Sequence, residues 1–259
     1  GIFNRTLGRL TGAGISTDSR IVNARAKWSG RNDKTDWRVR LQIPTGADAV
    51  YESILANNKL LDPLVPSRGI FWPLTPAVVI QHSANYNALA QTHSNYPFQA
   101  YQNSQVDSLN IIGEFPVQNA DDAKHWVATI NFLRTITKMY FGKEQALKGN
   151  PPPIMHLSGY GDHMFSKVPV IVNTFNVELR PGIDYISTRQ NPDGYSTART
   201  RERMGLPELE DSQTWAPTLS NISVLVTPVY SRNSIKNFSL SEFARGELSG
   251  KGTGEIGFI

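Results

Sequence analysis

The sequence predicts a mainly β or α+β fold, in which an antiparallel β-sandwich or barrel packs against one long helix and carries extended arms. Three observations lead to this fold class. Several segments alternate apolar and polar residues with a period of two, one segment repeats apolar residues at helical spacing, and three long stretches follow neither pattern.

Five or more segments have the pattern of β-strands. In residues 35–43 every second residue from Trp37 onward is apolar, which predicts a strand with one face in the core. A second strand is expected over residues 78–86. In residues 106–117 one face is apolar, and Gly113 within it indicates a bulge or a close backbone approach. The remaining strands are expected within residues 151–165, around a turn at Gly159 to Gly161, and in residues 168–180 and 221–230.

One segment, residues 119–141, has the pattern of a long helix. Asn119 is a suitable N-cap, and Asp121 and Asp122 complement the positive end of the helix dipole. Gly142 follows as a stop signal. The apolar positions at spacings of three and four are Trp126, Ile130, Leu133, Ile136 and Tyr140.

These patterns divide the chain into three parts. We expect an N-terminal arm at residues 1–34, a β domain at residues 35–243 that contains a long polar loop at residues 187–214, and a flexible Gly-rich tail at residues 244–259.

The composition excludes several classes of function. The chain has no Cys, so it can build neither a disulfide framework nor a thiolate metal site. A net charge of +4 does not require nucleic-acid binding. The longest apolar run is Ala77 to Ile80, and the N-terminal residues lack the apolar stretch of a secretory signal, so we expect a soluble intracellular protein without a membrane span.

No motif in the sequence indicates an enzyme. The patterns HExxH, GxSxG and GxxxxGK[ST] do not occur. The GxGxxG at Gly252 to Gly257 has no helix after it to face a phosphate. His156, Asp162 and His163 flank a turn and could bind a metal in a hydrolase, although ordinary turn chemistry is the preferred interpretation. We therefore expect no catalytic residue, no metal and no cofactor.

Residues 93–107 lie between two predicted strands and are expected to form a polar and aromatic loop, with one Asp and no Lys, Arg or Glu. Amide, His and Tyr side chains make hydrogen-bonded contacts without burying a charge, which favours an interface over a solvated surface. An ordered loop packed on its own domain is the alternative. An Arg-rich stretch in the polar loop is a second candidate contact, with nucleic acid or an acidic protein face, and a solvated loop is the equal alternative. The predicted subunit or layer interface consists of His93, Asn95, Tyr96, Tyr101, Asn103, Arg199, Arg201 and Arg203.

Four blocks of the sequence resemble baseplate and tail-tube initiator proteins of contractile-tailed bacteriophages. They are PAVVIQHSANYN, THSNYPFQAYQNSQVDSLNIIGEF, WVATINFLRTITKMYFG and PPPIMHLSGYGDHMFSKVPVIVNTFNVELRPGIDY, which fall within about residues 70–187. The resemblance implies the tail-tube fold and a hexameric ring whose inner strands line a DNA channel. It also implies adjacent tail-tube and baseplate hub proteins as partners, genomic DNA that passes without specific binding, and a place in the virion after assembly in the host cytoplasm. It carries over no catalytic residue.

Two departures from that family favour an initiating layer over the repeated tube. The arm at residues 1–34 and the tail beyond Phe243 are longer than a compact tube subunit needs. The Arg-rich stretch is expected on the outside, because cations in the lumen would hold DNA. A carbohydrate- or receptor-binding β-sandwich, with Tyr96, Tyr101 and Asn103 as a sugar platform, and the metal-assisted hydrolase remain as alternatives.

Overall fold

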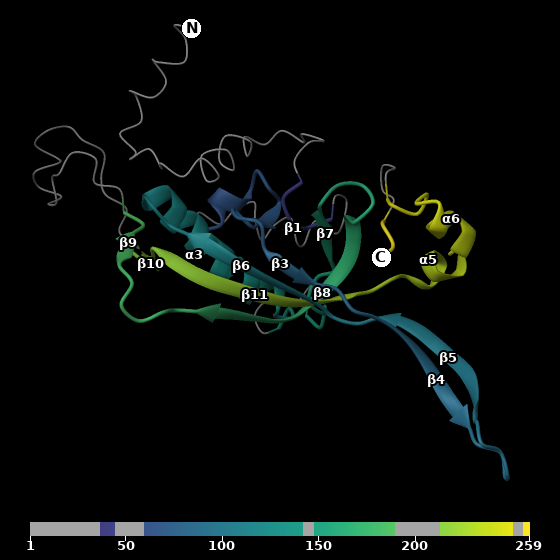
Figure 1. Ribbon diagram of the computed structural model, residues 1–259. Coiled ribbons are helices and arrows are strands. Elements are labelled where there is room, and N and C mark those ends of the chain that lie inside the picture. Colours follow the sequence, from purple (N-terminus) through teal and green to yellow (C-terminus); the bar gives the residue numbers. More distant parts are fainter. Residues whose placement is uncertain (1–36, 45–59, 142–147, 190–212, 251–255) are drawn as a thin grey trace, which may run out of the picture.

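Seven strands form one antiparallel sheet in the computed structural model, which describes residues 37–44, 60–141, 148–189, 213–250 and 256–259 (Figure 1). The strand order is β2-β1-β7-β8-β11-β6-β3. The bounds are β1 Arg40–Gln42, β2 Gly69–Phe71, β3 Ala77–Val79, β6 Leu109–Pro116, β7 Met155–Gly159, β8 Phe165–Glu178 and β11 Leu219–Pro228.

The sheet must be curled, since its two edge strands, β2 and β3, follow each other in the chain and are joined by a short connection. Only residues 72–76 connect β2 to β3, and such a connection reaches at most about 20 Å. The edges of a flat sheet of this size would lie about 29 Å apart, from a strand spacing of about 4.8 Å. The Tyr160 hydroxyl also donates to the carbonyl of Pro76, 3.1 Å away, across this connection. The sequence predicts either a sandwich or a barrel. A partly closed barrel fits better, because the seven strands form one curled sheet and not two packed sheets.

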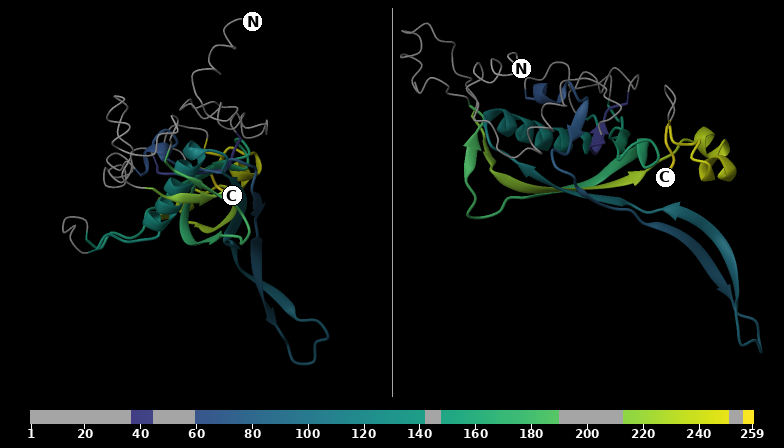
Figure 2. Two further views of the ribbon diagram at one scale, coloured as in Figure 1. Left: turned by 90° about the vertical axis from the view of Figure 1, so that its left-hand side faces the viewer. Right: turned by 45° about the horizontal axis from the view of Figure 1, so that its top comes forward.

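The helix α3 (Ala120–Ile136) packs on the sheet and confirms the predicted long helix (Figure 2). Its N-cap is Asn119, whose Oδ1 accepts from the Asp122 N–H at 2.9 Å. Trp126 lies within the buried face, and its Nε1 donates to the Ser220 hydroxyl on β11 at 2.8 Å. The other buried residues of the helix are Ala123, Ala128, Thr129, Ile130, Phe132, Leu133 and Ile136.

The predicted helix end at residue 141 is wrong. The helix ends in a tightened turn, in which the Lys138 N–H bonds to the Thr135 carbonyl, three residues back, at 3.0 Å. The chain then leaves the helix, and the Tyr140 N–H bonds to the Asn150 carbonyl at 3.1 Å. Gly142 lies outside the described residues.

Most strand predictions are confirmed in place but not always in length. The strand expected over residues 78–86 is instead two strands in different sheets, Ala77–Val79 and His82–Leu89. The apolar face of residues 109–117 is buried, as are Val39, Leu41 and Ile43. Trp37, however, is 49% exposed and stacks on Tyr160 outside the core. β1 is short because the residues before it bond to turns and loops, as the Trp37 carbonyl does to the Tyr160 N–H.

Short elements complete the body. The 3-10 helix η2 (Asp62–Leu64) and the two-stranded sheet of β9 (Tyr185–Ser187) and β10 (Trp215–Pro217) contact α3. The helices α5 (Arg232–Lys236) and α6 (Leu240–Ala244) follow β11.

The described ends of the C-terminal tail pack on the body, in contrast to the flexible tail expected. Ser249 and Gly257 form an antiparallel bridge. The ring of Phe258 stacks on Tyr230 at 4.4 Å, and the Ile259 N–H donates to the Tyr230 hydroxyl. The arm at residues 1–34 and most of the loop at 187–214 lie outside the described residues.

A two-stranded ribbon projects from this body. It consists of β4 (His82–Leu89) and β5 (Phe98–Val106), joined by residues 90–97 (Figures 1 and 2). The segment 93–107, expected as a loop between strands, is therefore largely a strand itself. Its period-two pattern is missing because both faces of the ribbon are exposed, so neither face needs to be apolar.

Candidate functional site: an uncharged projecting hairpin

The hairpin of residues 82–106 lies within a stretch of the chain that has no formal charge. Arg68 and Asp107 are the flanking charged residues, and no Asp, Glu, Lys or Arg stands between them. Surface ribbons in soluble proteins usually carry charges, which discourage pairing with other chains. The uncharged surface of this hairpin therefore needs an explanation.

Side-chain contacts between and along the two strands support their pairing, whose register shifts between Asn85 and Tyr86. Tyr86 and Tyr101 pack edge to face with ring centroids 5.6 Å apart, and the Asn85 side chain donates to Asn103 Oδ1 at 2.9 Å. Tyr101 also donates its hydroxyl to Ser104 Oγ at 2.8 Å. At the root, the Asp107 N–H bonds to the Gln81 carbonyl. These contacts make a defined ribbon rather than a loose loop.

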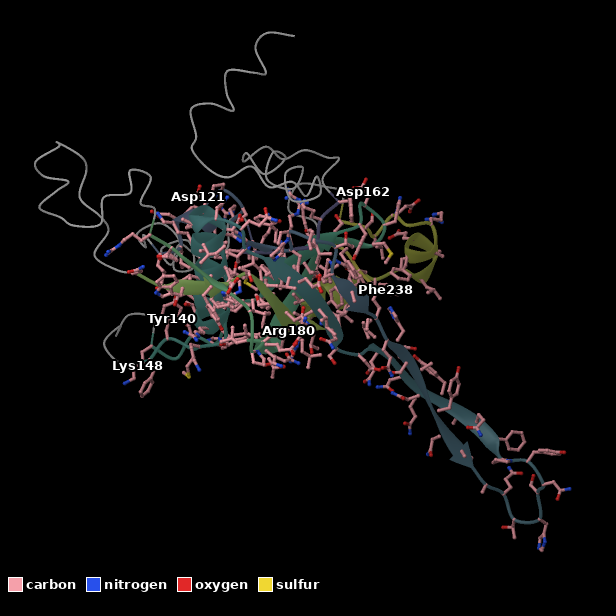
Figure 3. The ribbon with its side chains drawn as sticks, turned by 60° about the vertical axis from the view of Figure 1, so that its left-hand side comes forward. Asp121, Tyr140, Lys148, Asp162, Arg180 and Phe238 are labelled. Carbon is pink, nitrogen blue, oxygen red and sulfur yellow. The ribbon has the colours of Figure 1, made fainter. Side chains whose placement is uncertain are left out.

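The outer part of the hairpin, from Tyr86 to Tyr101, exposes large apolar side chains. Tyr96 is 84% exposed, and no residue of β4 or β5 is buried. An isolated two-stranded ribbon is at best marginally stable in water, and exposed apolar side chains in one region mark a contact surface. Figure 3 shows side chains projecting from both sides of the ribbon, away from the body. The exposed apolar residues are Tyr86, Leu89, Tyr96, Phe98 and Tyr101.

The outer edges of both hairpin strands are unpaired among the described residues. β4 pairs only with β5 and β5 only with β4, in a sheet of two strands. Their outer edges present main-chain N–H and C=O groups that can form hydrogen bonds with another strand. With a rise of about 3.4 Å per residue, the 8 residues of β4 reach about 27 Å from the root.

The structure brings five of the predicted interface residues onto this one element. His93, Asn95 and Tyr96 lie in the connecting loop, and Tyr101 and Asn103 lie on β5. His93 has a φ of 62°, a left-handed conformation that is unusual for a residue other than Gly. Arg199, Arg201 and Arg203 lie outside the residues that the structure describes.

Tyr86 and Leu89 on β4 belong to the same surface and were missed from the sequence. They lie outside residues 93–107, the segment in which the sequence predicts this part of the interface. The uncharged stretch, which already begins after Arg68, is the signal that would have included them.

A second surface is the outer face of β6, β11 and β8. Residues directly opposite each other in a sheet share a face. The register therefore groups Asn110 with Leu225 and Thr174, Ile112 with Ser223 and Asn176, and Glu114 with Asn221 and Glu178. These nine positions include two carboxylates but neither Lys nor Arg.

The residues considered for a metal site do not form one. His156 lies on β7 opposite Pro169, and Asp162 and His163 lie in the turn between β7 and β8. Burial, and after it the charge of Lys167, lowers the pKa of His156 below its ordinary value. In the described part of the chain, no group of three His, Asp or Glu residues is placed to hold an ion.

A pocket of about 390 Å³ lies at the root of the hairpin. Ile80 and His82 line one side of it, and Met164, Phe243 and Ile259 line the others. None of its lining residues is Asp, Glu, Lys or Arg, so the uncharged surface continues from the hairpin onto the body.

Among the described helices, none is long and apolar enough to cross a membrane. Comparison with known proteins finds no family model and no curated protein that matches this sequence.

Proposed function

We propose that this protein is a structural subunit that assembles with copies of itself into a ring. In this proposal the ring, a hexamer, lies at the junction of the baseplate hub and the tail tube of a contractile-tailed bacteriophage. There it initiates the tube and lines the channel through which DNA passes. It performs no chemistry.

The projecting hairpin carries the proposal. An uncharged ribbon with exposed aromatic side chains and unpaired edges is costly for an isolated protein, because it invites contact with other chains. It suits a subunit in which the next copy covers that surface. A hairpin that contacts a different patch of the next copy makes a head-to-tail contact, which produces rings or stacks.

The outer sheet face supports the role in a channel. Of the nine paired positions on this face, only Glu114 and Glu178 are charged. Lys and Arg bind DNA phosphates, and carboxylates repel them. A face of this composition lets DNA slide past.

The place in the virion and the hexameric state are supported by the resemblance of the sequence blocks. Two of the four blocks, residues 76–87 and 92–115, contain most of the hairpin and most of the strand β6. Part of the sequence that resembles the family is thus the part with the unusual surface.

Negative-stain imaging of the purified protein tests this proposal. We expect closed rings with a central hole, and tubes that grow from them when the tail-tube subunit of the same phage is added. Isolated particles of a single subunit that nucleate no tube would contradict it. If such a monomer bound glycans, the carbohydrate-binding alternative would replace the proposal.

A further inference from the structure

We propose that the hairpin of one copy adds as a strand to the free edge of β8, residues 171–178, in a second copy. This inference rests on the proposed self-assembly and specifies the surface that receives the hairpin. The main-chain hydrogen bonds would continue the sheet of one subunit into the ribbon of the next.

Among the described strands, the second half of β8 is paired on one side only. β7 covers β8 only between Phe165 and Val170, whereas β11 pairs along its other side as far as Glu178. In the described part of the chain, no strand pairs with the remaining side of residues 171–178. The main-chain groups on that side are therefore available to a partner strand.

The other edge strands described in the body are shorter than the free edge of β8. The edge strands β2 and β3 have 3 residues each, and so do β9 and β10. β2 is also buried along its length. The free edge of β8 matches β4, which has 8 residues, and β5, which has 9.

Charge and side-chain chemistry also match. Residues 168–177 have no formal charge, so an uncharged hairpin meets no ion until Glu178 at the end of the strand, and Glu178 is paired with Arg180 at 3.7 Å. On one face of the edge Val172, Phe175 and Val177 pack against the core but stay partly exposed. Tyr and Leu side chains of an added hairpin would cover them. On the other face Thr174 and Asn176 would meet the amide side chains of the hairpin.

The donor must be a different molecule. The hairpin leaves the body on the side of α5 and α6, whereas the free half of β8 runs in the opposite direction toward β9 (Figure 1). In Figure 3 Arg180, two residues beyond β8, lies on the body far from the hairpin tip. Within one chain the two surfaces do not meet.

Cross-linking of single-cysteine variants tests the inference, since the native chain has no Cys to interfere. Asn176→Cys is mixed with a size-tagged variant that carries Asn87→Cys on β4 or Gln99→Cys on β5. A short bismaleimide, which tolerates a small offset in register, then links the copies. Asn233→Cys, exposed on α5, replaces Asn176→Cys as the matched control.

We expect a product of mixed size with Asn176→Cys, at least about tenfold more abundant than with the Asn233→Cys control. In the assembled native protein, some amides of residues 171–178 should also exchange with deuterium at least about tenfold more slowly than in a variant without the hairpin. Rings that form with neither the cross-link nor this protection would overturn the inference and leave the proposed function standing. A protein that stays monomeric would overturn both.

Discussion

At the scale of single residues, Gly113 shows how one position shapes the curled sheet. It lies on β6, and a Cβ atom there would collide with Cδ1 of Trp72, a side chain that is fully buried. Trp72 belongs to the short connection between the two edge strands. The missing side chain at Gly113 therefore lets this connection pack against the sheet.

Gly113→Ala should lower the free energy of unfolding by about 1–3 kcal/mol, because the added methyl group overpacks a site that is already full. Urea unfolding followed by Trp fluorescence measures the change. Ser223→Ala, on the outer face of the neighbouring strand, is the control and should change stability by less than about 0.5 kcal/mol. A Gly113→Ala variant as stable as the native protein would show that Trp72 can move away at no cost.

His156 should make stability depend on pH. Its pKa is lowered in the folded state by burial and then by Lys167, so the unfolded chain binds a proton more readily. Stability is therefore complete above the pKa of His in the unfolded chain, which is about 6.5, and falls as the pH drops through the lower folded value.

His156→Gln should remove part of this dependence. The measurement is the free energy of unfolding by urea between about pH 5 and pH 8 for both proteins. The native protein should lose more stability on the acidic side than the variant does. Identical slopes would mean that His156 is not responsible for the loss.

At the scale of elements, the sequence predicts what touches the core. The strand at residues 109–117 and the start of α3 follow from apolar periodicity and the Asn119 cap, since burial selects these residue types. The predicted end of α3 is wrong, because the chain turns after Ile136 through the hydrogen bond from Lys138 to Thr135, which apolar periodicity does not reveal. The hairpin was misread as a loop, because a ribbon exposed on both faces has no apolar alternation to reveal it.

The free edge of β8 could not be read from the sequence for a related reason. A long strand is predicted over residues 168–180, and β8 spans Phe165–Glu178. Within β8, only residues 165–170 pair with β7. The extent of this pairing depends on how two separate strands meet, which the periodicity of either strand does not determine. Such an edge becomes visible only with the topology.

Asn176→Lys should weaken self-assembly by about tenfold, equivalent to about 1.4 kcal/mol, because a charge on an edge strand discourages pairing with another chain. Asn176 is exposed, so the fold should be retained. Asn233→Lys makes the same change away from the edge and should assemble like the native protein. Sedimentation velocity measures both, and equal weakening by the two variants would point to net charge rather than to the edge.

At the scale of the whole molecule, the fold separates a curled body from a surface that reaches out of it. The body is covered by α3 and encloses the described core, whereas the hairpin buries nothing of its own. In the proposed assembly another copy covers this ribbon, which offsets the cost of exposing it. This division of roles is what one expects of a subunit rather than of a free-standing protein.

Assembly should resist salt. The hairpin and most of the free edge of β8 carry no formal charge. Salt therefore has few charge–charge interactions to screen at this contact. The mass of the assembly at about 0.1 M and about 1 M NaCl should be equal, as light scattering can show. Dissociation at the higher concentration would indicate that ion pairs, for example from charged segments outside the described residues, hold the subunits together.

The most direct test of the central claim is sedimentation velocity over a range of concentrations, for the native chain and for a variant with a shortened hairpin. In the variant Ser83 is joined to Gln105, its partner in the register, by an Asn-Gly turn, so the root of the ribbon and the body are kept. We expect the native protein to form one discrete oligomer and the variant to remain a monomer with an unchanged fold. A native protein that is monomeric at every concentration, or a variant that assembles equally well, would contradict the account.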